Sequence, residues 1–420
     1  MLRSRNQYSW ERFAGDCAGG FIAALIALPY GLSMAALMGL PPILGVFTSI
    51  ISTPVVVLLG RNSLLIGGTA SATVPFIASA VHAQGIAGAA KISIVASVFM
   101  MCFCIMHLGR HASRVPIPVV SGFSAGIGAL MVISQLNIVL GVHPSSSEIP
   151  VVQLAFVISQ IGEMRWLPVA LSFAVIIAAF ISARTSHRLP APLIGVTISL
   201  LVALSLHSHE PEVGSLRLGM PSFAGFSWTP HDVVTLLPSG LMLAFVSSVN
   251  LLLTSRTIEH FQGRHKPLLR ADSDAEVGAY GIANLTVGIF GAPMSVGIPA
   301  RSVAAIRCGA TTRLANVMHA VMLLIFVRYG SGVLAHIPIA ALAGVTAYMG
   351  ISLLDIGTWH RLGKMHVLDA AGFLVTVIGV LVSNAVIAVL AGTFLYVLHY
   401  AYKRYSASLR LPAGAADKAA

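Results

Sequence analysis

Long apolar runs, separated by short polar intervals, recur along the whole of this 420-residue chain. Runs of about 18 or more apolar residues can cross a bilayer as helices, and the pattern predicts about fourteen spans. The predicted spans are 17–37, 42–59, 70–83, 89–108, 119–140, 167–183, 192–206, 232–255, 277–290, 299–308, 314–327, 339–354, 367–382 and 385–400. We expect an amphipathic or interfacial helix over 150–161 and a polar connection outside the membrane over 208–229.

Two of the shorter spans follow a break in helical continuity. The stretch 64–69 is extended and glycine-rich before the span at 70–83, and 291–299 carries glycine and proline before the span at 299–308. The first N–H groups of a helix have no partner within it and form the positive end of its dipole. Broken segments at corresponding positions of two halves indicate a binding site at mid-membrane.

An internal resemblance supports two repeats. The run Ile-Pro-Val-Val-Ser-Gly at 117–122 resembles Ile-Pro-Ile-Ala-Ala-Leu at 337–342, and both begin helices rich in small residues. An odd number of spans in each repeat places the second upside down relative to the first. We therefore expect inverted repeats at 15–207 and 231–404, an extracytoplasmic connection at 208–230, and cytoplasmic segments at 1–14 and 405–420. Gly122 and Gly126 have the spacing that permits close helix packing.

Composition supports a membrane protein and explains the net charge. The chain is 56% hydrophobic and 9% charged, with a mean hydropathy of +0.88, outside the range of soluble domains. Most of the 25 Lys and Arg residues lie on the side of the two termini, and Lys91, Arg165, Arg217 and Arg328 lie opposite. This asymmetry predicts cytoplasmic termini in the plasma membrane, the inner membrane in a bacterium. The net charge of +11 therefore needs no nucleic acid to explain it.

Arg301 stands alone in an otherwise apolar stretch. A cation facing lipid costs about 2.5–3.5 kcal/mol by insertion scales, so we expect this side chain to face a cavity or an ion. At the start of a short helix, it would add to the positive dipole end and attract an anion. Its neighbours Ala300 and Ser302 offer backbone N–H groups or a hydroxyl.

Further candidates lie on other predicted spans: Tyr30, Met34, Thr69, Ala70, Ser71 and Thr73 for the substrate, and Ser247, Ser248 and Asn250 for a coupling ion. The hydroxyls near the third helix could instead cap it or bond back to a carbonyl. Tyr30 could be an interfacial aromatic, and Met34 could be simple packing. Asn250 needs hydrogen-bond partners in an apolar helix, which a neighbouring helix would supply as well as an ion.

Several segments together resemble the sulfate permease (SulP) family of anion transporters. They are Gly15–Gly20 with Leu28–Ala35, Gly39–Phe47, Val119–Phe123, Gly281–Leu285, and Ala300–Ser302 with Gly309–Leu314. The resemblance implies fourteen spans in 7+7 inverted repeats, with a core domain that moves against a gate domain. It also implies an anion site between the third and tenth helices.

The chain departs from the family pattern at four points. Tyr30 replaces a usual Gln and Met34 an aromatic residue, Thr69 stands in place of a Pro, and Asn250 aligns with a Glu tied to coupling. The cytoplasmic STAS domain that usually follows the last span is missing from this sequence. Because Asn cannot titrate, proton symport through position 250 is disfavoured.

The function expected from these features is secondary active transport or exchange of a small anion by alternating access. Sulfate, bicarbonate, chloride and a dicarboxylate are all compatible, and sodium remains a possible coupling ion. The alternatives are a nucleobase-type permease of the same fold and an uncoupled anion channel. We expect no enzyme activity, cofactor or metal, because paired carboxylates, a phosphate loop and HExxH or CxxC spacing are missing. Besides membrane lipid, the expected partner is a second copy of the chain.

Overall fold

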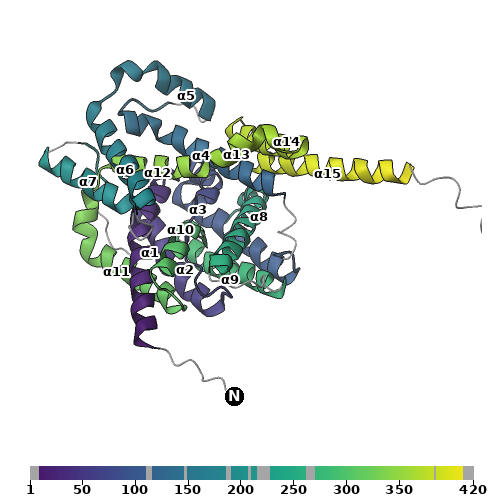
Figure 1. The fold of residues 1–420 in the computed structure, drawn as a ribbon, viewed down its shortest axis with the longest axis horizontal. Coiled ribbons are helices and arrows are strands. Elements are labelled where there is room, and N and C mark those ends of the chain that lie inside the picture. Colours follow the sequence, from purple (N-terminus) through teal and green to yellow (C-terminus); the bar gives the residue numbers. More distant parts are fainter. Residues whose placement is uncertain are drawn as a thin grey trace, which may run out of the picture.

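The computed structural model describes residues 9–109, 116–145, 149–185, 191–206, 210–214, 228–261, 270–382 and 385–409. The chain is helical over most of these residues (Figure 1). The helices are α1 (Trp10–Leu37), α2 (Pro42–Leu59), α3 (Val74–Ile105), α4 (Ile117–Leu140), α5 (Pro150–Ser159), α6 (Trp166–Thr185), α7 (Ala191–Ser205), α8 (Pro230–Phe261), α9 (Arg270–Ile289), α10 (Pro299–Arg307), α11 (Leu314–Ala335), α12 (Ile339–Leu353), α13 (Ile356–Arg361), α14 (Val367–Val382) and α15 (Ala385–Leu409). Two short strands, β1 (Gly67–Thr69) and β2 (Ser295–Gly297), and the 3₁₀ turn η1 (Ser71–Thr73) precede α3 and α10.

The predicted spans correspond to these helices with a few differences at their ends. The spans predicted at 70–83 and 89–108 are joined in α3, which is interrupted by non-helical Gly85 (φ 64°, ψ −150°). The helices α1, α8, α9, α11 and α15 extend beyond their predicted bounds, and α13 was not predicted. The expected connecting segments 1–14, 208–230 and 405–420 lie partly outside the described residues.

The outer surface is apolar, as lipid contact requires. Seven of the described helices are long and apolar enough to cross a membrane, and others are shorter apolar helices. On α6, the side chains of Phe173, Ile177, Phe180 and Ile181 share one helix face and are 40–57% exposed. An exposed apolar face of this kind is costly in water and favourable in lipid. The fold is that of an all-α polytopic membrane protein.

The helices pack in two groups. In the first group, the core, α3 packs on α8 and α9, and α1 packs on α2, α10 and α11. In the second, the gate, α4 packs on α12, α14 and α15, and α6 packs on α7 and α12. Contacts of α1 with α7 and α12 join the two groups. Figure 1 shows α15, in yellow, projecting away from the rest of the bundle.

The two broken segments are held together by a strand pair. β1 and β2 are antiparallel, with Gly67 opposite Gly297 and Thr69 opposite Ser295. Each strand precedes the helix that begins after the break in its own repeat. Because equivalent segments of inverted repeats run in opposite directions, the two strands pair antiparallel. The sequence predicted the breaks and the helices after them, but not this pairing between chain segments far apart in sequence.

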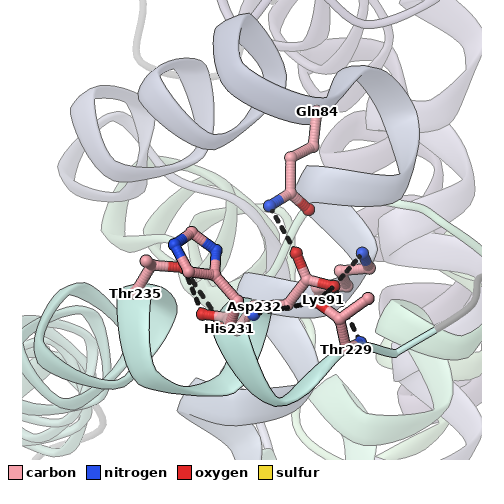
Figure 2. A network of polar contacts seen from close by, with 6 residues as sticks. All are labelled: Gln84, Lys91, Thr229, His231, Asp232 and Thr235. Carbon is pink, nitrogen blue, oxygen red and sulfur yellow. Dashed lines mark hydrogen bonds and ion pairs between the residues drawn. The ribbon is translucent and has the colours of Figure 1, made fainter.

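A polar network crosses from α3 to α8 beside the Gly85 interruption (Figure 2). The Lys91 ammonium forms an ion pair of 2.9 Å with Asp232 Oδ2, and both side chains are buried. Gln84 donates to Asp232 Oδ1 over 2.9 Å, and the Thr229 N–H and hydroxyl donate to Oδ2. The carboxylate therefore joins the two arms of α3 to the start of α8.

The paired glycines of α4 lie against α14. A Cβ added at Gly122 would lie 2.5 Å from the Phe373 carbonyl oxygen, and one at Gly126 would lie 2.8 Å from Val380 Cβ. Only glycine leaves room for this approach of the two helices. The predicted packing role of these two glycines is confirmed.

Candidate functional site

The start of α10 is fixed by its local sequence. Pro299 occupies the first turn, where its missing N–H costs no hydrogen bond, and Ile298 before it is extended (φ −108°, ψ 112°). The Ser302 N–H already donates to the Ile298 carbonyl over 3.2 Å. Ala300 is exposed and lines a cavity. The N-terminus of α10 therefore presents its positive dipole end to that cavity.

The start of α3 is its counterpart. Ala70 is extended (φ −113°, ψ 145°), and Ser71 then opens the 3₁₀ turn η1, whose Thr73 N–H and hydroxyl both donate to the Ala70 carbonyl. Ala70 and Ser71 line the same cavity as Ala300. Two helix N-termini from the two repeats thus border one cavity, as the sequence predicted for its paired broken segments.

The cavity has a volume of about 470 Å³ and lies between the two helix groups. Tyr30 of α1, η1, the start of α10 and one face of α8 form the core side. On the gate side, α4, α12 and α15 contribute Val119, Val120, Phe123, Ser124, Ile127, Met349, Ser352, Leu353 and Val389. Both helix groups therefore contribute walls to this cavity.

Arg301 lies behind this cavity and is 1% exposed. Its Nη1 donates to Ser49 Oγ over 3.0 Å and to the Gly67 carbonyl over 3.4 Å. The guanidinium carbon lies 5.1 Å from the centre of the Tyr30 ring, and Tyr30 itself lines the cavity. We expected Arg301 to face a cavity, but the guanidinium is not among the lining groups. Tyr30 is therefore the residue that contacts both the guanidinium and the cavity.

In the part of the chain that the structure describes, no carboxylate balances the charge of Arg301. Among the described residues, Arg301 forms no ion pair, and its Nε and Nη2 have no hydrogen-bond partner. An unpaired cation in a low-dielectric interior is costly and produces a strong positive potential around it. A negative solute near the two helix N-termini would lower that cost.

Three of the predicted substrate residues hold the segments around the site in place and do not line the cavity. The Thr69 hydroxyl donates to the Gly45 carbonyl over 3.0 Å. The Ser302 hydroxyl accepts from the Ile66 N–H and donates to the Ile298 carbonyl, both over 2.9 Å. Met34 is fully buried and packs in the core. None of the three lines the cavity.

The coupling-ion candidates divide in the same way. Asn250 lines the cavity together with Thr254, whose hydroxyl donates to Asn250 Oδ1 over 3.4 Å. Ser247 and Ser248 are buried one turn earlier on α8 and do not line it. Within the described residues, neither serine hydroxyl has a hydrogen-bond partner. Also within those residues, no three His, Cys, Asp or Glu side chains are grouped to hold a metal ion.

Two polar residues of α11 were missed by the sequence analysis. Asn316 donates to the Leu65 carbonyl over 3.1 Å, on the extended segment whose Gly67 carbonyl accepts from Arg301. His319 is fully buried, and neither ring nitrogen has a partner among the described residues. The available signal was a pair of polar residues three apart inside a predicted apolar span.

These features define an integral membrane protein with a solute cavity between two helix groups and two inverted half-helices at its border. The model of the sulfate permease family matches residues 13–379, and the chain belongs to that family. This bears out the resemblance drawn from the sequence motifs.

Curated relatives cover most of the chain at low identity. The bicarbonate transporter BicA of Picosynechococcus is 27% identical over 413 residues, which are 94% of this chain and 71% of BicA. YvdB of Bacillus subtilis is 25% identical over 80% of this chain, and sulfate transporter 3.2 of Arabidopsis thaliana is 23% identical over 88%. The chain spans 64% of YvdB and 60% of the Arabidopsis transporter.

Two solved structures share the fold. The transmembrane domain of a cyanobacterial bicarbonate transporter, BicA, has a TM-score of 0.80 at 24% identity and covers 92% of this chain and 99% of that domain. The murine anion transporter Slc26a9, in an inward-facing state, has a TM-score of 0.85 at 17% identity, over 95% of this chain and 70% of that one. At these identities the likeness establishes the architecture.

Proposed function

We propose that this protein is a secondary transporter of small anions that works by alternating access. The observation that carries the proposal is the cavity where two opposed helix N-termini meet in front of Arg301, which is buried and forms no ion pair among the described residues. Each helix N-terminus is equivalent to roughly half a positive charge. Membership of the sulfate permease family supports the same function.

The proposed anion site consists of Ala70 and Ser71 at the start of η1, Ala300 at the start of α10, and Tyr30. The first-turn N–H groups of η1 and α10 would hydrogen-bond the anion, and Arg301 would neutralise it from behind. Three other residues would act indirectly, by holding the segments around the site in place. The hydroxyls of Thr69 and Ser302 bind backbone groups there, and Met34 packs in the core. Binding needs no covalent step, so we propose no enzymatic activity.

Alternating access follows from the position of the cavity between core and gate. A solute held by the core at η1 and α10 can be exposed to either side if the core moves against α4, α12 and α15. Asn250, with Thr254 and nearby Ser247, is the proposed place for a coupling sodium ion. The Asn250 amide cannot carry a proton in exchange, which favours sodium coupling or anion exchange at this position.

The remaining parts of the proposal concern the setting of the chain. The distribution of Lys and Arg supports cytoplasmic termini and a plasma-membrane location. We propose repeat boundaries near residues 15–207 and 231–404, and association as a homodimer. Cysteine accessibility tests the repeat boundaries, and the mass of the detergent-solubilised protein tests the homodimer.

The test is uptake of radiolabelled sulfate, bicarbonate or chloride into proteoliposomes, with sodium, pH and internal anion varied separately. We expect Arg301→Ala to lose nearly all anion binding and uptake, while Arg301→Lys, which keeps the charge, retains part of both. Arg328→Ala is the matched control, because Arg328 is an exposed arginine of α11. Thermal unfolding of each variant separates loss of function from loss of fold. Unchanged uptake in a folded Arg301→Ala protein would refute the proposed site.

A further inference from the structure

The cavity is polar at one end and apolar over most of its lining. Its polar groups lie mainly on the core side, at the two helix N-termini and at Tyr30, Ser71, Asn250 and Thr254. The opposite wall is apolar apart from two serines. Its apolar members are Val119, Val120, Phe123, Ile127, Met349, Leu353 and Val389. The core side also carries Phe245, Val246, Val249 and Leu253 of α8, so the cavity has one positive end and is apolar over most of the rest of its lining.

The size of the cavity also exceeds the needs of a bare inorganic anion. Its volume of about 470 Å³ lies in the range of cavities that bind organic ligands, which are mostly apolar with a few placed polar groups. A water molecule takes about 30 Å³ of liquid, so a small oxyanion at the helix N-termini would leave most of the space unfilled.

The apolar wall offers few replacements for a hydration shell. The oxygens of sulfate point in all directions, and those turned toward Phe123 and Met349 would meet no hydrogen-bond donor of these side chains. Leaving polar atoms without partners away from water is costly. A carboxylate concentrates its charge at one end, so its head can meet the N–H groups while its carbon chain meets the apolar wall.

We propose that the site takes a monocarboxylate with an apolar body of several carbons. This inference rests on the proposed function and specifies its substrate class. The carboxylate lies at Ala70, Ser71 and Ala300, and the apolar body lies between Phe123 of α4 and Met349 of α12. Contact with the gate then depends on the apolar body, so specificity is set by the gate wall as well as by the charged end.

The experiment measures binding of acetate, butyrate and hexanoate to the purified protein in nanodiscs by calorimetry at fixed pH and ionic strength. Binding is the appropriate measurement, because protonated carboxylic acids cross lipid without a transporter. Sulfate, bicarbonate and neutral butyramide are tested in parallel. Burying a methylene group strengthens binding about fourfold, so each two-carbon extension should tighten Kd by roughly fifteenfold until the wall is covered.

A gate-wall variant tests where the carbon chain lies. Met349→Gln should reduce the gain from acetate to hexanoate by at least threefold, so that it weakens hexanoate binding more than acetate binding. A second variant, Phe123→Thr, tests the same wall from α4. Met164→Gln is the matched control, because Met164 lies outside the cavity and is 48% exposed. This control also accounts for hexanoate that enters the lipid of the nanodisc.

The outcomes separate this inference from the function on which it rests. The inference is supported if affinity rises with the length of the carbon chain and if Met349→Gln or Phe123→Thr weakens that rise. Equal affinity for acetate and hexanoate, with tighter binding of sulfate or bicarbonate, overturns it and leaves small-anion transport intact. Butyramide binding as tightly as butyrate, or failure of every anion to bind, overturns the proposed function itself.

Discussion

Asn284 should control the position of the α10 N-terminus. This fully buried residue of α9 binds both backbone groups of Ser295 in β2: its Nδ2 donates to the carbonyl over 2.9 Å, and its Oδ1 accepts from the N–H over 2.6 Å. Ser295 is also fully buried, so water cannot replace a lost bond. Asn284→Leu therefore leaves two buried backbone groups without partners.

The expected cost follows from these two groups. Each buried donor or acceptor left unsatisfied costs about 1–3 kcal/mol, so Asn284→Leu should destabilise the protein by roughly 2–6 kcal/mol. If each kcal/mol lowers the unfolding midpoint by about 2 °C, as in larger domains, the midpoint falls by roughly 4–12 °C. Anion affinity should fall as well, because β2 leads directly into α10.

The assay is thermal unfolding in detergent with anion binding measured alongside. Asn137→Leu in α4 is the control, since it changes the same residue type away from the strand pair. Asn284→Asp gives a second test: a protonated carboxyl can both donate to the Ser295 carbonyl and accept from its N–H, whereas the ionised form can only accept. Stability of this variant relative to the unmodified protein should therefore rise as pH falls. A cost below about 1 kcal/mol for Asn284→Leu would refute the reasoning.

Three further predictions concern other parts of the core. Gly68→Ala should cost about 1–3 kcal/mol of stability and weaken anion binding, because its Cβ would lie 2.7 Å from Ser49 Oγ and still closer to Arg301 Nη1; unchanged binding would count against a role for that contact. Lys91→Met should lower the unfolding midpoint more than the double variant Lys91→Met/Asp232→Leu does, since the single change leaves a carboxylate without its cation; the reverse order would contradict this. Uptake by the unmodified protein should not respond to an inward proton gradient beyond ionisation of the substrate, whereas Asn250→Glu should acquire such a response. Steep stimulation of uptake by an inward proton gradient in the unmodified protein would refute the view that Asn250 excludes proton coupling.

Much of the fold could be predicted from the sequence, because a bilayer constrains the chain so strongly. Apolar runs give the spans, the position of Lys and Arg gives an expected orientation, and glycine and proline mark the breaks at 64–69 and 291–299. The family could also be predicted, since its motifs lie in these same segments. The ends of α8 and α11 were predicted less accurately, because polar residues can continue a helix beyond the lipid.

The sequence by itself thus determined the membrane class, the two broken half-helices and the presence of a cation beside one of them. Only the tertiary structure decided that β1 pairs with β2, that Thr69 and Ser302 bind backbone groups of the segments around the site, and that Arg301 lies behind the cavity. The physical reason is that hydropathy depends on each residue's own chemistry, whereas the direction of a side chain depends on the partners that packing brings to it. Ser49, Gly67 and Tyr30 meet Arg301 from positions more than 200 residues away in sequence, and no local pattern encodes that contact.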